Sequence, residues 1–253
     1  MVNLVKYIFF ICLSVILLIS CTLTSNNARA DDSVPNESFI QIISVLTVSK
    51  CDETKKKLKD CITGSWGRSA SGMVIDLSTN HTLALTVGHI CHIDLPSSVL
   101  ESDTKISILA PNKKMYEADI VDFSLNEENK PDLCLIKIHK YKAPKVKMSK
   151  RKPKIGERYL SIGAPKGIYH PPVVPIFQGI FSGNLSNVSS MYTIRSAPGS
   201  SGSAVVDKNG EIVGVIYAVS TLFDSISLVT TFESTKKFLS EAKKKLPTPL
   251  PSQ

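Results

Sequence analysis

Short runs of apolar and β-branched residues, separated by turn residues, make up most of the chain between residues 38 and 230. Val, Ile, Thr and Tyr dominate these runs, which recur at intervals of roughly 8 to 15 residues, a pattern typical of an all-β sandwich or barrel. The turn Asp207-Lys208-Asn209-Gly210 indicates a hairpin within one of them. Strands are expected within residues 39–48, 71–77, 82–88, 105–110, 116–123, 132–138, 158–164, 173–183, 191–196, 203–220 and 225–232.

One helix is predicted near the end of the chain, over residues 234–246. Ser234 is its expected N-cap, and Pro247 ends it and begins a proline-rich tail over residues 247–253. Its apolar residues recur at helical spacing and fall on one side. These residues are Phe238, Leu239, Ala242 and Leu246.

The first thirty residues have the pattern of an export signal, with Lys6 ahead of a continuous apolar run over residues 7–21. Ala28-Arg29-Ala30 matches an A-x-A cleavage site, which predicts a signal peptide over residues 1–30 and one domain over residues 31–246. Leu18-Ile19-Ser20-Cys21 resembles a bacterial lipobox, so a lipoprotein anchored at Cys21 is the alternative, and a retained segment is a third. All three place the domain outside the cytoplasm, periplasmic or secreted, with membrane association only through Cys21 or a retained signal.

Four cysteines lie beyond the export segment: Cys51, Cys61, Cys91 and Cys134. An even number in an exported chain predicts disulfides, and four cysteines allow three pairings. Cys51 and Cys61 are expected to close a local loop. There is no C-x-x-C pair, so no metal site is predicted, and no cofactor is expected.

The net charge of +8 falls to +6 without residues 1–30, which contain two basic residues and no acidic one. Lysines concentrate in residues 137–154, which raises the question of a nucleic-acid partner. That segment contains a single aromatic residue and so offers no stacking platform for bases. A solvated lysine-rich loop is the preferred interpretation, with no nucleic-acid partner.

Three short stretches together indicate nucleophilic catalysis. His89 follows a predicted strand in ALTVGHIC, Asp132 begins the strand DLCLIKI, and Ser201 lies in the glycine-flanked turn APGSSGSAVV. A serine hydroxyl needs a base to take its proton, and histidine titrates near neutrality. A carboxylate orients the imidazole, while glycines beside the serine free backbone N–H groups for an oxyanion. Each stretch alone is weak evidence for catalysis. The three together, in the order His, Asp, Ser on a predicted all-β chain, are stronger evidence.

These stretches resemble the trypsin-like (chymotrypsin-fold) serine proteases, in the style of the HtrA/Deg-type bacterial branch without a PDZ domain. ALTVGHIC resembles the family segment T-A-x-H, with Val87-Gly88 in place of the usual small pair. DLCLIKI resembles its D-[IL]-A-[VL]-[LI]-[KR] strand, and PGSSGSAVVDKNGEIVGV resembles its nucleophile segment. SASGMVID, IGERYLSIGAPKGI and QGIFSG match further family segments in order. The resemblance covers about residues 65 to 235 and implies two six-stranded antiparallel β-barrels with a short C-terminal helix.

The resemblance also implies roles for individual residues. His89 is the expected base, Asp132 orients it and Ser201 is the nucleophile, with the N–H groups of Gly199 and Ser201 as the oxyanion hole. His92 is a rival base that lies three residues past the motif position. Cys91 lies two residues after His89, and Cys134 lies two residues after Asp132. If the His89 and Asp132 side chains meet, the two cysteines are therefore expected to be neighbours.

By the family pattern, Tyr217, Ala218 and Val219 form the edge that pairs with a peptide main chain, and a small or apolar P1 residue is expected. The implied function is an exported serine endopeptidase that acts on polypeptides through an acyl-enzyme. The alternative keeps the fold without catalysis, as an inactive binding or scaffold protein.

Overall fold

The computed structural model describes residues 34–52, 62–220, 223 and 225–246. The expected signal peptide, its two processing sites and the proline-rich tail lie outside these residues, so those boundaries stay predictions. Within the described ranges, no helix is both long and apolar enough to cross a membrane.

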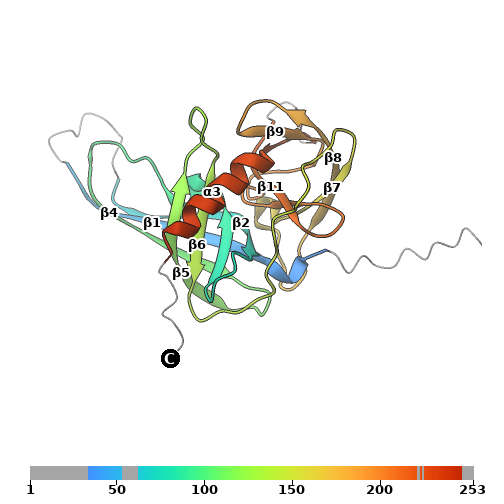
Figure 1. Cartoon of the computed structure of the whole chain (residues 1–253). Coiled ribbons are helices and arrows are strands. Elements are labelled where there is room, and N and C mark those ends of the chain that lie inside the picture. Colours follow the sequence, from blue (N-terminus) through green and yellow to red (C-terminus); the bar gives the residue numbers. More distant parts are fainter. Residues whose placement is uncertain (1–33, 53–61, 221–222, 224, 247–253) are drawn as a thin grey trace, which may run out of the picture. The chain divides into compact units, whose positions relative to one another are not determined.

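The first closed barrel has six antiparallel strands in the spatial order β1-β2-β3-β6-β5-β4. Its labelled strands β1, β2, β4, β5 and β6 lie in the left half of Figure 1. A single turn of 3-10 helix, Asn36–Ser38, precedes it, and helix α2 (Gly88–Cys91) follows β3. The interior is lined by aliphatic side chains without exposure, among them Ile42, Leu85 and Ile136. Its strands are β1 (Phe39–Cys51), β2 (Gly64–Ile75), β3 (Thr82–Thr86), β4 (Val99–Leu109), β5 (Met115–Ser124) and β6 (Leu133–Ile138).

The second closed barrel has the order β10-β11-β12-β9-β8-β7. The predicted hairpin joins β10 to β11, and Gly210 N–H donates to Asp207 C=O (2.9 Å) at its turn. Its strands are β7 (Arg158–Ile162), β8 (Ile176–Asn184), β9 (Ser189–Tyr192), β10 (Ala204–Val206), β11 (Ile212–Val219) and β12 (Ser227–Thr230), with a 3-10 turn at Pro165–Gly167. The expected all-β fold of two six-stranded antiparallel barrels is thereby confirmed.

Tyrosines form part of both cores. Tyr192 is 1% exposed and packs its ring edge-on against Tyr159 in the second barrel. Burial is the main cause that raises the pKa of Tyr192 above its usual range and the pKa of Tyr159 to about 12. Burial likewise raises the pKa of Tyr169 to about 12, and Tyr169 meets Phe39 edge-on at a ring distance of 4.9 Å.

Helix α3 (Phe232–Lys244) contacts β6 of the first barrel and β11 of the second (Figure 1). The predicted cap at Ser234 is wrong, because the helix begins two residues earlier, after Thr231. The Thr231 hydroxyl accepts a hydrogen bond from the Ser234 N–H (3.2 Å), which satisfies one of the free donors of the first turn. The predicted apolar face is confirmed for Phe238, Leu239 and Ala242, all buried, and Leu246 packs against the same core.

Candidate active site

His89 lies on the single turn of α2, and its ring contacts the carboxylate of Asp132, the residue immediately before β6. The ring Nδ1 is 2.6 Å from Asp132 Oδ2, and the backbone N–H of His89 donates to Asp132 Oδ1 (2.9 Å). A carboxylate acceptor at Nδ1 fixes the tautomer with its proton there and leaves Nε2 free to accept another. The Asp132 side chain is 7% exposed and that of His89 is 44% exposed, so the pair joins a buried acceptor to an accessible base.

Gly88 leaves the space in which His89 and Asp132 come into contact. The sequence pattern did not show why a glycine is needed at this position. A Cβ at position 88 would lie 2.0 Å from the backbone oxygen of Ser124 and 2.9 Å from Asp132 Oδ1. Any side chain there would push the carboxylate or the β5–β6 loop away from α2. The Val87-Gly88 departure from the family segment therefore has a steric reason.

A disulfide joins α2 to β6 beside the same pair. Cys91 and Cys134 are bonded with an S–S distance of 2.07 Å and a Cα–Cα distance of 6.5 Å, and both are buried. This confirms the pairing expected from their positions two residues past His89 and Asp132. Cys51 ends β1, whereas Cys61 lies outside the described residues, so the Cys51–Cys61 bond stays a prediction.

Ser201 lies in a turn between two glycines with left-handed backbone angles, Gly199 (φ +95°) and Gly202 (φ +88°). A Cβ on Gly202 would lie 1.9 Å from the Ser71 backbone oxygen and 2.5 Å from Thr86 Oγ1, so only glycine brings this turn against β3, the strand that leads to His89. Among the described residues, the N–H groups of Gly199 and Ser201 donate to no other group, and no hydrogen bond joins the Ser201 hydroxyl to His89. The turn thus presents two free donors and a half-buried hydroxyl.

Ser71 on β2 holds this turn in place, and the sequence reading missed it. Its side chain is fully buried, and its hydroxyl donates to Gly199 C=O (2.9 Å) while accepting from Ala164 N–H (2.9 Å). Its backbone N–H donates to Ser201 C=O (2.8 Å), and its backbone oxygen accepts from the Thr86 hydroxyl (2.7 Å). Ser71 therefore ties the first barrel to the turn that carries Ser201.

The Pro165–Gly167 turn orients the adjoining peptide. Lys166 N–H donates to Pro198 C=O (2.6 Å), and Lys166 itself has left-handed angles (φ 52°). In a trans peptide, N–H and C=O point in opposite directions, so fixing the Pro198 oxygen aims the Gly199 N–H away from Lys166. Gly199 packs tightly here, since a Cβ would lie 2.7 Å from the Ala164 oxygen.

The outer half of β11 carries Tyr217, Ala218 and Val219, the predicted peptide-pairing edge. Strand β10 pairs with β11 only as far as Val215, whereas β12 continues to pair on the other side up to Val219. Beyond Ile216, which bonds to Gly202 and Ser203, the edge that faces away from β12 has no strand partner within the described residues. The Tyr217 hydroxyl donates to Ser189 Oγ (2.7 Å), which anchors this side chain within the second barrel.

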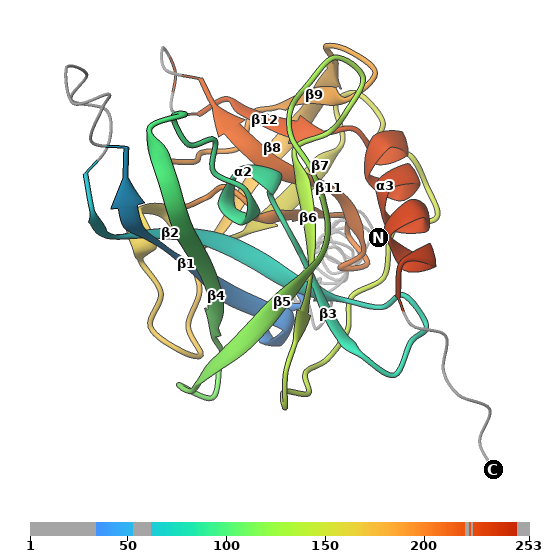
Figure 2. The same ribbon diagram turned by 90° about the vertical axis from the view of Figure 1, so that its left-hand side faces the viewer.

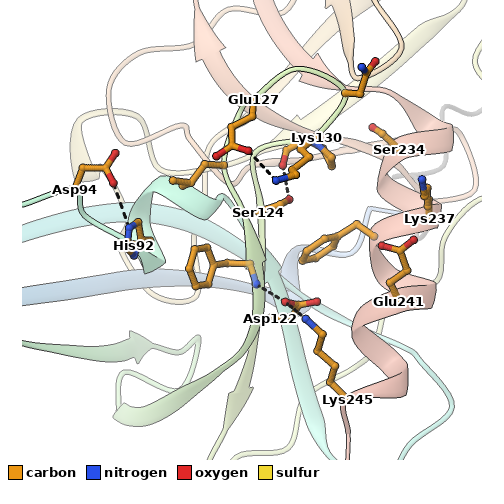
Figure 3. Close-up of a pocket in the computed structure, with 15 residues that line it drawn as sticks. His92, Asp94, Asp122, Ser124, Glu127, Lys130, Ser234, Lys237, Glu241 and Lys245 are labelled. Carbon is orange, nitrogen blue, oxygen red and sulfur yellow. Dashed lines mark hydrogen bonds and ion pairs between the residues drawn. The ribbon is translucent and has the colours of Figure 1, made fainter.

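The rival base His92 points elsewhere. Its Nε2 lies 3.2 Å from Asp94 Oδ1, and its ring stacks on Phe123 at 5.1 Å. His92 lines a cavity of about 640 Å³ with the β5–β6 loop and α3, where Lys245 pairs with Asp122 (Figure 3). His89, not His92, is the histidine that contacts Asp132. Across the described ranges, His, Cys, Asp and Glu side chains form no group of three that could hold a metal ion.

Comparisons with known proteins agree with this fold. The family model of the trypsin-like peptidase domain matches residues 70–215, more than half of the chain. The active form of the Rv3671c protease of M. tuberculosis is similar in structure, with a TM-score of 0.59, 14% identity and coverage of 87% of this chain and 85% of that chain. The inactive form of a serine-to-alanine mutant of Rv3671c is similar with a TM-score of 0.57, 15% identity and coverage of 87% and 94%. No curated protein matches the chain in sequence.

Proposed function

The chain belongs to the trypsin-like peptidase family, and on that premise we propose that it is an exported serine endopeptidase with the triad His89, Asp132 and Ser201. The observation that carries this proposal is the double contact of Asp132 with the ring and the backbone of His89. Such a contact fixes the imidazole so that Nε2 is the free, basic nitrogen. That nitrogen is suited to activate a hydroxyl at neutral pH.

The proposed reaction starts when His89 Nε2 takes the proton of the Ser201 hydroxyl. Ser201 Oγ then bonds to the carbonyl carbon of the scissile peptide, and the carbonyl electron pair moves to its oxygen. The N–H groups of Gly199 and Ser201 stabilise that oxyanion, which supplies the largest part of the rate enhancement in such sites. The C–N bond breaks as the leaving amine takes the proton from His89.

Water completes the cycle in the second half of the reaction. His89 takes a proton from water, the hydroxide attacks the acyl carbon, and the bond to Ser201 Oγ breaks as that oxygen regains its proton. Asp132 stabilises the imidazolium in both halves. The chemistry uses the chain's own residues and requires neither metal nor cofactor.

Polypeptides are the proposed substrates, and the open edge at Tyr217, Ala218 and Val219 is the proposed pairing site for the segment before the scissile bond. An extended peptide gains main-chain hydrogen bonds at such an edge, while its side chains reach pockets on alternate sides. A small or apolar P1 residue is proposed from the family resemblance. Profiling with a peptide library tests this, and strict cleavage after Lys or Arg would refute it.

An exported location is part of the proposal. The Cys91–Cys134 disulfide is typical of an oxidising compartment. Cleavage after Ala30 would release the domain, whereas lipid attachment at Cys21 would anchor it. Intact mass measurement of the protein purified from its native envelope or medium distinguishes these two forms.

Peptide hydrolysis by matched variants tests the enzymatic proposal. Ser201→Ala and His89→Ala should each reduce kcat by about 10³-fold or more. Asp132→Asn should also reduce kcat, because it leaves the imidazole proton on the wrong nitrogen. Lys208→Ala, an exposed change at the β10–β11 turn, is the control and should retain wild-type hydrolysis. If folded wild-type protein binds peptides but hydrolyses none, the inactive binding protein is the correct alternative.

A further inference from the structure

The linker that joins the two barrels, between the end of β6 and the start of β7, is strongly basic and lies on the surface. Residues 137–156 contain nine lysine and arginine residues and neither aspartate nor glutamate. Eight of these nine side chains are exposed and are called the basic face. They are Lys140, Lys142, Lys145, Lys147, Lys150, Arg151, Lys152 and Lys154.

Most cations of the basic face have no carboxylate beside them. Arg151 pairs with Glu157, and Lys152 pairs with Glu233. The other six form no ion pair with any residue that the structure describes. The basic face therefore carries an excess of positive charge, which attracts an anionic surface.

In the first barrel, the linker lies at the end opposite the triad residues. His89 follows the end of β3, and Asp132 precedes the start of β6. The linker instead contacts the loop before β3, where Lys145 Nζ donates to Thr79 C=O (2.9 Å) and His81 C=O (3.1 Å). Strand β6 ends at the same end of the barrel as the β4–β5 turn, on the side away from α2 (Figure 2).

The linker has the same position relative to the second barrel. Ser201 precedes the start of β10, whereas Asp207 follows the end of this strand. Linker residue Met148 bridges to Ile212 at the start of β11, and the Ser149 hydroxyl donates to Asp207 Oδ2 (2.7 Å). The linker thus crosses both barrels on the side away from the proposed site. A surface bound to the basic face would leave that site accessible to polypeptides.

The described part of the chain begins beside this linker. Ser38, in the 3-10 turn ahead of β1, donates its hydroxyl hydrogen to Pro144 C=O (2.9 Å). Twelve residues separate Val34 from Cys21, which is the predicted lipid attachment site and the last residue of the apolar run over 7–21. Twelve residues span at most about 43 Å. Attachment through Cys21 or through the apolar run would therefore keep this side of the domain close to a bilayer.

A bilayer suits the basic face better than a nucleic acid does. Tyr141, the single aromatic residue of the linker, is 8% exposed, and its ring packs against Tyr116 at 4.8 Å. The linker thus offers no aromatic face on which bases could stack. Ile155 follows Lys154 and is 75% exposed. An exposed apolar side chain beside cations is typical of segments that lie on a membrane surface.

We propose that the basic face binds an anionic phospholipid bilayer and orients the triad end of the domain away from it. Each lysine close to an anionic membrane strengthens binding by about fivefold. Stable attachment usually combines two signals, such as one lipid chain and a polybasic surface, so the basic face complements attachment through residues 1–30. Only the orientation of the site rests on the proposed function, because the binding itself requires no catalysis.

Lysine acetylation followed by mass spectrometry tests this contact in the full chain. The protein is mixed with vesicles of phosphatidylcholine alone or with vesicles that also contain phosphatidylglycerol, and a water-soluble acetylating reagent is added. Lys142, Lys147 and Lys150 should react at least about fivefold more slowly on the anionic vesicles. Lys166, which is exposed beside the proposed site, should react equally fast on both. The comparison of two vesicle types holds whether residues 1–30 are retained or removed.

A triple variant tests the basic face from the protein side. Lys142→Gln, Lys147→Gln and Lys150→Gln are combined, which should weaken the contact with anionic lipid by about 100-fold, at about fivefold per lysine. The remaining lysines Lys140 and Lys154 should then be acetylated equally fast on both kinds of vesicle. Added salt should have the same effect on the wild-type chain, because it screens charge contacts with lipid.

The matched control combines Arg68→Gln, Lys105→Gln and Lys166→Gln. These three side chains are also exposed and form no ion pair with a described residue, but they lie outside the linker. The control removes the same charge and should keep the slow acetylation of the basic face on anionic vesicles. Thermal unfolding shows that both triple variants are folded.

Three results would overturn the inference. The first is equal acetylation of the basic face on both vesicle types, and the second is equal loss of protection in the two triple variants. The third is protection by a single-stranded oligonucleotide but not by anionic vesicles, which would assign the basic face to nucleic acid. Failure of the folded protein to hydrolyse any peptide would count against the proposed function and would leave these measurements unaffected.

Discussion

Replacing Ser71 by alanine should lower turnover more than it lowers stability. The change removes one buried hydroxyl that accepts from Ala164 N–H and donates to Gly199 C=O, both at 2.9 Å. Without it, nothing in the first barrel holds the Gly199 peptide through a side chain. The turn between the two proposed oxyanion donors, and Ala164 at the start of the Pro165–Gly167 turn whose Lys166 N–H binds Pro198 C=O, are then held less firmly. The N–H groups of Gly199 and Ser201 stay in place but are less rigidly oriented.

The structure sets the size of both effects. A buried donor left without its acceptor costs about 1–3 kcal/mol, and the lost bond to Gly199 adds about 1 kcal/mol, so unfolding should become about 2–4 kcal/mol easier. In a domain of this size that corresponds to about 4–16 °C in Tm. Deleting one oxyanion donor outright costs about 10²–10³-fold in kcat. Because Ser71→Ala leaves the donors present but loosened, we expect kcat to fall by about 10–100-fold with KM nearly unchanged.

Ser149→Ala is the matched control. Ser149 is also buried, and its hydroxyl also makes two hydrogen bonds, donating to Asp207 Oδ2 (2.7 Å) and accepting from Arg151 N–H (3.2 Å). Asp207 follows β10, at the opposite end of that strand from Ser201. Thermal unfolding, kcat and KM are measured for both variants on one peptide. If the two variants lose similar Tm and kcat also falls equally in both, Ser71 is only a structural residue and the reasoning is refuted.

Three further results are expected. Gly88→Ala should abolish hydrolysis and lower Tm, because its Cβ would lie 2.0 Å from the Ser124 oxygen and 2.9 Å from Asp132 Oδ1; wild-type kcat in a folded variant would contradict this. Replacing Cys91 and Cys134 together by serine should lower the free energy of unfolding by about 4 kcal/mol, as closure of the 43-residue separation predicts, and denaturant titration would show it. Tyr159 and Tyr169, with pKa values raised to about 12, contribute stability that is complete below their unfolded pKa near 10 and is lost as the pH rises from about 10 toward 12. The share of the absorbance at about 295 nm that is lost on changing both residues to phenylalanine should therefore appear only together with alkaline unfolding, and its appearance near pH 10 in folded protein would contradict the packing.

Local patterns in the sequence sufficed to predict the barrel strands, the Asp207–Gly210 turn and the apolar face of α3. Period-two alternation and turn residues are local signals, and both survive in strands that have one buried face. The outer half of β2 was missed because residues 64–69, GSWGRS, are exposed on both faces and so show no alternation. The start of α3 was misplaced because both Thr231 and Ser234 are acceptable caps, and only the three-dimensional contact distinguishes them.

For the site, the family resemblance carried the choice of His89 and Asp132, which the structure brings into contact, and it led to the Cys91–Cys134 pairing. Ser71 and Gly88 could not have been found in the same way. Ser71 acts through bonds to residues 93 and 128 positions away, and Gly88 is required by the backbone of another strand. Such requirements come from contacts between segments that lie far apart in the sequence, which no local pattern encodes.

The identity of the nucleophile is tested most directly by mass spectrometry after reaction with a fluorophosphonate. The folded wild-type chain should gain one adduct, on the peptide that contains Ser201, and Ser201→Ala should gain none. His89→Ala should react much more slowly, because no base remains to take the serine proton. An unreactive folded wild-type chain, or equal labelling of Ser201→Ala, would contradict the assignment.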